Sequence, residues 1–141
     1  VMGTSARLRS LPMPQMDLRS AAQSVLAENH GKDIAILFGQ ERAGLTNDEI
    51  QRCHQLVHVD TDPGFGSLNL SQAVQLMAYE IRMAVIGGAG TVLKPSIRLL
   101  VHLNWENRKH LMWHLIKVLI HGFVNNMSSS RMSVKVYSLI R

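Results

Sequence analysis

Two short stretches of this sequence carry residue types that suit the binding of a nucleotide-like ligand. Leu37–Thr46 reads LFGQERAGLT, and Ser67–Leu70 reads SLNL at the start of a long amphipathic run. Gly39 and Gly44 have no Cβ, so a ligand can approach the backbone N–H and C=O groups there. Opposite charges lie between the two glycines, at Glu41–Arg42. Together the two stretches favour a nucleotide-like cofactor held by loops.

Each stretch also has a plainer interpretation. GQERAG could be an ordinary strand-to-helix turn with solvated charges, and SLNL could be only a helix start with Ser67 or Asn69 as its N-cap. A third stretch, Gly3–Arg7 (GTSAR), could equally be a turn held by its Ser and Thr side chains. The occurrence of LFGQERAGLT and SLNL in one chain favours ligand binding over these alternatives.

Short apolar runs in the first part of the chain are typical of strands. Ile34–Phe38 and Val57–Val59 are expected to be buried strands, and Val1–Gly3 has the pattern of the end of a third strand whose beginning is missing. The sequence therefore predicts a chain that starts inside a fold. Two prolines in Leu8–Met16 exclude a regular helix and predict a surface loop.

Three helices are expected around these strands. Asp17 supplies an N-cap for a helix over Leu18–Ala27. A capping box at Thr46–Glu49 precedes a short helix that ends near Cys53. From Ser67 onward, apolar residues recur at helical spacing, namely Leu70, Ala73, Val74, Met77, Ala78 and Ile81. Strands that alternate with helices predict an α/β fold with a mostly parallel sheet, and such sheets bind ligands at the carboxyl ends of their strands.

The composition is typical of one compact domain with an appendage. Of the 141 residues, 46% are hydrophobic and 18% are charged, which allows a sizeable core. A single cysteine, Cys53, excludes an internal disulfide and fits a reducing compartment, where we expect a buried, inert thiol. The sequence shows neither a signal peptide nor an apolar stretch of the roughly 18 residues that a membrane span needs. We therefore expect a soluble, cytoplasmic protein without a membrane partner.

Positive charge is concentrated toward the carboxyl end. Residues 1–90 carry seven basic and nine acidic side chains, whereas residues 91–141 carry eight basic side chains and one acidic side chain, Glu106. This asymmetry fits contact with a polyanion such as RNA, and it fits a solvated basic helix face equally well. Spacing over Glu106–His121 predicts a helix, and the alternation at Met132, Val134 and Val136 predicts a final strand.

No group of residues has the pattern of a metal site. His54 and His58 straddle a predicted helix end and a predicted strand, and His110 and His114 have no third ligand beside them in the sequence. We therefore expect no metal.

The order of four motifs resembles that of one enzyme family. GTSAR, FGxERxGLTN, the pair Cys53-His54 and SLNLxxAVQ occur in the order found in the SpoU/TrmH-type RNA 2′-O-ribose methyltransferases of the SPOUT superfamily, and they are most similar to the TrmJ-type tRNA enzymes. The resemblance covers Val1–Ala84, about three-fifths of the chain. It implies a SPOUT-type α/β trefoil-knot fold, the methyl donor S-adenosyl-L-methionine, a tRNA substrate and a homodimer formed through the knotted surface.

The same resemblance assigns roles to particular residues. Glu41, Ser67 and Asn69 match polar residues that the family places in or beside the active site. Contacts to the cofactor, largely through backbone groups, are implied for Thr4, Ser5, Ala6, Gly39, Val59, Ser67, Leu68 and Asn69.

The sequence departs from the family at both ends. The family's first motif, which carries an asparagine and the arginine assigned to activating the 2′-hydroxyl, is absent, so we expect a fold that is incomplete at its amino end. A non-catalytic RNA-binding or assembly module derived from the same fold is therefore the alternative function.

We expect the chain to be divided into a cofactor-binding part over residues 1–86, a linker over 87–104 and a basic extension over 105–141.

Overall fold

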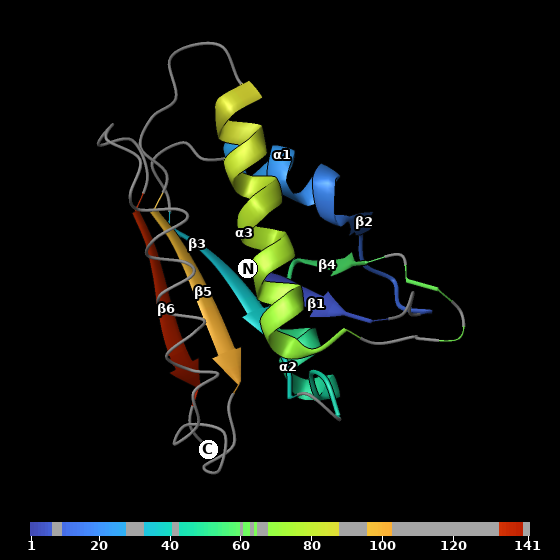
Figure 1. Ribbon diagram of the computed structural model, residues 1–141. Coiled ribbons are helices and arrows are strands. Elements are labelled where there is room, and N and C mark those ends of the chain that lie inside the picture. Colours follow the sequence, from blue (N-terminus) through green and yellow to red (C-terminus); the bar gives the residue numbers. More distant parts are fainter. Residues whose placement is uncertain are drawn as a thin grey trace.

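The computed structural model of the chain is built on one six-stranded sheet (Figure 1). It describes residues 1–6, 10–27, 33–40, 43–59, 61–62, 64, 68–87, 96–102 and 133–139, the last two ranges as backbone only. The strand order is β2-β4-β1-β3-β5-β6, and all neighbouring strands in this order are parallel. The predicted α/β class with a parallel sheet is confirmed.

The described residues alternate between strands and helices along the chain. The strands are β1 (Met2–Ser5), β2 (Gln15–Asp17), β3 (Asp33–Phe38), β4 (Gln55–His58), β5 (Ser96–His102) and β6 (Ser133–Leu139). The helices are α1 (Leu18–Ala27), α2 (Asn47–Gln51) and α3 (Leu70–Gly87). Each of these helices links two strands, as parallel pairing requires.

One face of the sheet is covered by α1 and α3, which lie side by side (Figure 1). Helical spacing correctly predicted the buried side of α3, where Leu70, Val74, Met77, Ala78 and Ile81 lie in the core. From α1 and the strands, the same core receives Ala21, Ala22, Val25, Met2, Ile36, Phe38 and Val57. Alternate residues of a strand face the same side of a sheet, so these strand residues define the face that the two helices cover.

A second, smaller core lies on the other face of the sheet. Leu45, Ile50 and Leu56 are buried there, with Met13 and Leu37 packed against them. A Cβ on Gly3 would lie 2.7 Å from Cys53 Sγ and 3.1 Å from Leu45 Cδ1. Glycine therefore lets β1 pass directly beneath this cluster.

Several predicted bounds differ from the observed ones. The strand expected at Val1–Gly3 continues to Ser5, because Thr4 and Ser5 pair with Val57 and His58 of β4. The end of the loop expected over Leu8–Met16 is also a strand, since Gln15–Asp17 pairs with β4. Helix α3 starts at Leu70 and not at Ser67.

The segment beyond α3 holds one strand that the sequence analysis missed. β5 lies within residues 87–104, which were expected to form a linker, and it pairs with β3 along its length. The strand predicted near Val134 and Val136 is confirmed as β6. The helix predicted over Glu106–His121 lies outside the described residues. The predicted knot depends on the loop before α3, of which residues 60, 63 and 65–67 are likewise outside them, so the knot stays a prediction.

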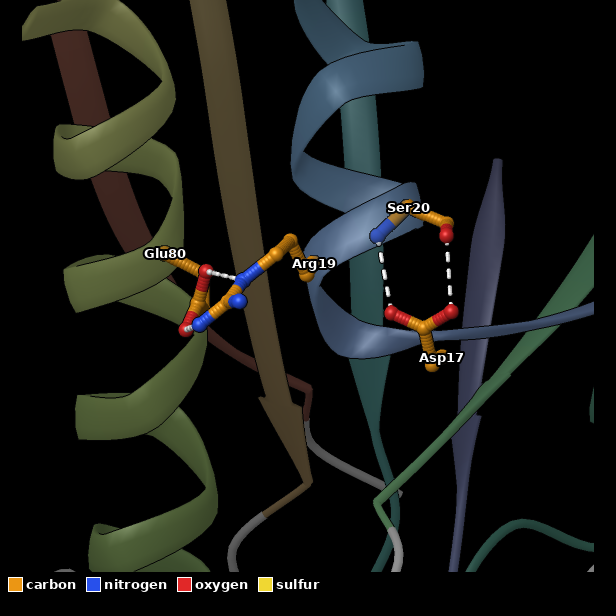
Figure 2. Close-up of polar contacts among 4 residues, drawn as sticks. All are labelled: Asp17, Arg19, Ser20 and Glu80. Atoms are coloured by element: carbon orange, nitrogen blue, oxygen red, sulfur yellow. Dashed lines mark hydrogen bonds and ion pairs between the residues drawn. The ribbon is translucent and has the colours of Figure 1, made fainter. Parts of the chain in front are cut away.

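Helix α1 begins at a side-chain cap, as the sequence predicted (Figure 2). The backbone N–H of Ser20 donates to Asp17 Oδ1 at 2.9 Å, and the Ser20 hydroxyl donates to Asp17 Oδ2 at 2.7 Å. The hydroxyl bond is the main cause that lowers the pKa of the Asp17 carboxyl. In the same turn, Arg19 forms an ion pair with Glu80 of α3, with 3.3 Å between Nε and Oε2 (Figure 2). The Arg19 side chain is 75% exposed, so this ion pair contributes little to stability.

Replacing Asp17 by alanine should lower the free energy of unfolding at pH 7 by about 1 kcal/mol, because the first turn of α1 loses its cap. Folding lowers the pKa of Asp17. The contribution of this carboxylate to the free energy of unfolding is therefore complete above the ordinary pKa of 3.8 and is lost as the pH falls through the lower pKa of the folded state. The stability difference between wild type and Asp17→Asn should therefore change over that acid range. Urea denaturation at several pH values measures both effects. Gln23→Ala, at an exposed position of α1, is the control, and an equal loss in that variant would contradict the assignment.

Candidate functional site

Three neighbouring strands end at the same edge of the sheet. Ser5 of β1 lies opposite His58 of β4, so the residues that follow, Ala6 and Val59, leave the sheet side by side. Gly3 lies opposite Leu37 of β3, which brings Gly39 level with Ser5. Because the carboxyl ends of parallel strands share one edge, these residues line the place where open α/β sheets bind ligands.

The start of α3 lies at the same edge. Leu70, the first residue of α3, is 5% exposed and belongs to the buried cluster that contains Phe38 and Val57, which lie at the carboxyl ends of β3 and β4. Figure 1 shows the first turn of α3 beside the ends of β1 and β3. Leu68 and Asn69 immediately precede this turn.

The loop after β3 folds back tightly on itself. The N–H of Gln40 donates to Gly44 O at 3.1 Å, and the N–H of Gly44 donates to Gln40 O at 2.7 Å. A Cβ on Gly39 would lie 2.1 Å from the carbonyl carbon of Gly44 and 2.2 Å from the nitrogen of Leu45. The missing Cβ of Gly39 thus makes room for the loop's own backbone.

Gly44 is needed for a different reason. Its φ is +68°, in the left-handed region that favours glycine, while a Cβ there would meet no atom within 4 Å. The expectation that Gly44 offers its backbone groups to a ligand is wrong, because its N–H and C=O both bond to Gln40.

Thr4 joins two of the converging strands through its side chain. Its Oγ1 donates to the carbonyl oxygen of Leu37 in β3 at 3.0 Å. This bond fixes the end of β1 against the end of β3. The Thr4 hydroxyl has used its one hydrogen in this bond, so toward a ligand it can act only as an acceptor.

Asn69 is the N-cap of α3. Its Oδ1 accepts from the backbone N–H of Ser71 at 2.9 Å and from the Ser71 hydroxyl at 2.7 Å, while the N–H of Asn69 donates to Gln72 Oε1 at 3.2 Å. The carboxamide oxygen is thus occupied, and this sets the orientation of the amide, with Nδ2 left as the group that can donate to a ligand. Sequence reasoning identified Asn69 as a possible cap but did not anticipate Ser71 and Gln72, although N-x-x-Q is the spacing of a capping box.

Helix α2 anchors the loop that precedes it. The predicted capping box is confirmed, since the N–H of Glu49 donates to Thr46 Oγ1 at 3.3 Å and the N–H of Thr46 donates to Glu49 Oε2 at 2.7 Å. Cys53 Sγ donates to Glu49 O at 3.3 Å, and the residue is 6% exposed. Burial raises the pKa of the Cys53 thiol, as expected for an inert core cysteine.

The described residues include most of the predicted site. Thr4, Ser5, Ala6, Gly39, Val59, Leu68 and Asn69 all lie at the edge described above. Glu41 and Ser67, which were predicted to act in catalysis, lie outside the described residues. Within the described ranges, no three His, Cys, Asp or Glu side chains come together in a way that could hold a metal ion. In the same ranges, no helix is both long enough and apolar enough to cross a membrane.

A family model and curated proteins match the part of the chain that forms this site. The model of the SpoU rRNA Methylase family matches residues 2–79. The tRNA (cytidine/uridine-2′-O-)-methyltransferase TrmJ of Klebsiella pneumoniae is 51% identical over 84 residues, which are 60% of this chain and 34% of that protein. The tRNA (cytidine/uridine/adenosine-2′-O-)-methyltransferase TrmJ of Pseudomonas aeruginosa is 50% identical over 98 residues, which are 68% of this chain and 37% of that protein.

Solved structures match the same region. The structure of a probable methylase family protein from Haemophilus influenzae is 46% identical, with a TM-score of 0.56, over 61% of this chain and 36% of that one. TrmJ from Z. mobilis is 42% identical, with a TM-score of 0.52, over 57% of this chain and 35% of that one. The chain thus spans about a third of the length of the relatives that it matches.

Exchanging either glycine of the loop after β3 for alanine should destabilise the protein by different amounts. Gly39→Ala forces the backbone of Gly44 and Leu45 to move, so a loss of roughly 3 kcal/mol or more in the free energy of unfolding is expected. In Gly44→Ala the new methyl group meets open space, so stability should fall only by the cost of a left-handed backbone at alanine, about 1–2 kcal/mol. Urea denaturation of the two variants side by side measures the difference. An equal or smaller loss for Gly39→Ala would contradict the close approach.

Proposed function

Because the chain belongs to the SpoU rRNA Methylase family, we propose that it binds S-adenosyl-L-methionine at the edge formed by β1, β3 and β4 and methylates a ribose 2′-hydroxyl in RNA. The relatives are named as tRNA methyltransferases, which makes tRNA the proposed substrate class and the cytoplasm the proposed location. The observation that carries this proposal is the convergence of Thr4–Ala6, Gly39, Val59 and Asn69 at one edge, within the residues that the family model matches.

The residues at this edge suit an adenosyl group. Ala6 and Val59 lie just past the strand ends, where backbone N–H and C=O groups leave the sheet ladder and can bond to the edge of an adenine ring. The Asn69 amide is held with its oxygen on Ser71, so it presents Nδ2 as a donor to a ligand oxygen. The bound methyl donor supplies an electrophilic methyl group on a positively charged sulfur.

The loop residues act by holding this edge in place. Thr4 ties β1 to β3, the Gln40–Gly44 pairing closes the loop beside Gly39, and the Asn69 cap fixes the start of α3. Such a site is organised before its ligand arrives, which limits the ordering cost of binding. Glu41 and Ser67 keep their proposed roles in ordering the acceptor nucleotide.

Two variants of Asn69 separate its capping role from its proposed ligand contact. Asn69→Asp keeps an oxygen that can cap α3 but removes the Nδ2 donor, so stability should hold while affinity for S-adenosylhomocysteine falls about tenfold. Asn69→Ala should lose that affinity and also about 1 kcal/mol of stability. Calorimetry with S-adenosylmethionine and S-adenosylhomocysteine, together with urea denaturation, provides both measurements.

The function itself is tested with the wild-type chain and transfer of a radiolabelled methyl group to bulk tRNA. Digestion of the product to nucleosides followed by periodate oxidation, which cleaves only a free 2′,3′-diol, shows whether the methyl group is on the ribose. Absence of binding to both ligands at millimolar concentration would end the proposal for this chain. An unchanged affinity of the Asn69→Asp variant for S-adenosylhomocysteine would contradict the placement of the site at Asn69.

A homodimer is proposed from the outer side of α3. Leu76, Tyr79, Met83 and Ile86 are 38%, 43%, 42% and 55% exposed, and their spacing repeats that of an a/d helical seam. They lie on the side of α3 opposite its buried residues, so the helix is apolar on both faces. A helix of this kind is typically covered on both sides, which supports a second copy of the chain as the partner.

Met83→Lys should weaken self-association by about tenfold or more, because it places a charge in the middle of this apolar stripe. Sedimentation equilibrium over a range of concentrations measures the dissociation constant. Gln51→Lys adds the same charge at an exposed position of α2 and should leave association unchanged. A monomeric wild type, or equal effects of the two lysines, would count against this surface.

A further inference from the structure

Strand β3 leads into the loop that contains Gly39, and its two neighbours in the sheet hold it to very different extents. β1 pairs with β3 at two adjacent positions, Ile36 and Leu37. β5 pairs with β3 at all six of its residues, from Asp33 to Phe38. Figure 1 shows β5 alongside β3, directed toward the same end of the molecule. Most of the backbone pairing of β3 is therefore with β5.

The pairing between β1 and β3 ends before the loop begins. Gly3 opposite Leu37 is the last position of that ladder, and beyond it Thr4 Oγ1 donates to the Leu37 carbonyl oxygen at 3.0 Å. Phe38, the residue directly before Gly39, lies opposite Val101 of β5. In the register of the described strands, the residue that leads into the loop is thus paired with β5 alone.

The two neighbours of β3 restrict different movements of this strand. Two adjacent pairs extend over only about 3 Å, so β3 can still tilt about them, whereas six pairs extend over about 17 Å and fix the direction of the strand. Bonds between Gln40 and Gly44 close the loop into one unit, which packs against the backbone of Gly39 and moves with the end of β3. At its other end the loop is anchored by Leu45, which is 3% exposed. β5 and Leu45 therefore fix the two ends of the loop.

The strand that fixes the direction of β3 lies outside the part of the chain that matches the family. The family model covers residues 2–79, whereas β5 begins at Ser96. We propose that β5 is the positioning strand of the cofactor loop, acting through β3, so that binding of S-adenosyl-L-methionine depends on a segment beyond the family match. This inference rests on the proposed function and deepens it.

Hydrogen exchange of the wild-type chain tests this dependence without reference to activity. If opening of β5 releases the loop, a ligand of the loop must in turn oppose the opening of β5. At S-adenosylhomocysteine concentrations about 100 times the dissociation constant, exchange of the β5 amides should slow about 100-fold. Without ligand, the amides of β3 and β5 should show the same free energy of opening, because the two strands open together. Exchange of β5 that ignores the ligand, or that proceeds while β3 stays protected, would overturn the inference.

Two proline substitutions in one row of the sheet separate the role of β5 from that of β6. Leu99 of β5 lies opposite Ile36 of β3 on one side and Val136 of β6 on the other. A proline within a strand removes a backbone donor from the ladder. Leu99→Pro should weaken binding of S-adenosylhomocysteine about tenfold or more, because binding must then order the loop, while the amides of β1 and β4 stay protected. Val136→Pro should leave this affinity unchanged.

The outcomes distinguish this inference from the proposed function. Wild-type affinity in Leu99→Pro, or an equal loss in both proline variants, would overturn the positioning role of β5 and leave the methyltransferase function standing. If Leu99→Pro does not fold, the exchange of the wild-type chain decides the question. A wild type that binds neither S-adenosylmethionine nor S-adenosylhomocysteine would overturn the proposed function and this inference with it.

Discussion

The pairing of β1 between β3 and β4 is the constraint on which the candidate site depends. All four residues of β1 pair with β4, Met2 and Gly3 also pair with β3, and Met2 is 3% exposed between the two neighbours. The close approach of Gly3 to Cys53 and Leu45 leaves little freedom for β1 to shift along its neighbours. A slip by one residue would turn each side chain of β1 to the opposite face, moving Met2 out of the larger core toward the crowded Cys53 side and placing Gly3 in the larger core. The register of this strand therefore decides which residues reach the edge.

Much of the hydrogen-bonding capacity at the edge is used to hold the edge together. The Thr4 hydroxyl bonds to Leu37, the backbone of Gly44 bonds to Gln40, and the Asn69 oxygen bonds to Ser71. Among the described residues, the backbone beyond the strand ends and the Nδ2 group of Asn69 can still bond to a ligand. This distribution suits recognition of a flat, hydrogen-bonding ring by backbone groups. Several residues at the edge therefore support its structure, and replacing them would change the affinity for a ligand indirectly.

Local signals in the sequence predicted local structure well. The caps at Asp17 and Thr46, and the buried side of α3, depend on residues three or four apart, and all three are confirmed. β2 and β5 were missed because each depends on a partner far away in the chain, β4 and β3 respectively. For β5 a signal existed in the apolar run that contains Leu99–Val101, bounded before the strand by Pro95, which is typical of a strand buried in a parallel sheet. The site was predicted mainly from the order of the motifs. Glycine is needed at Gly39 because the backbone of the loop returns close to it, and the spacing of residues in the sequence does not reveal that approach.

The separation in sequence between β1 and its partners affects how the protein folds. Met2 pairs with Ile36 and with Gln55, so the centre of the sheet forms only by joining residues that are far apart in the chain. Closing such long segments costs entropy before any contact compensates for it. Mixed α/β domains with many contacts of this kind fold more slowly than helical bundles, whose contacts are local. During synthesis, β1 leaves the ribosome well before β3 and β4, and its unpaired edges are exposed to other chains until they arrive.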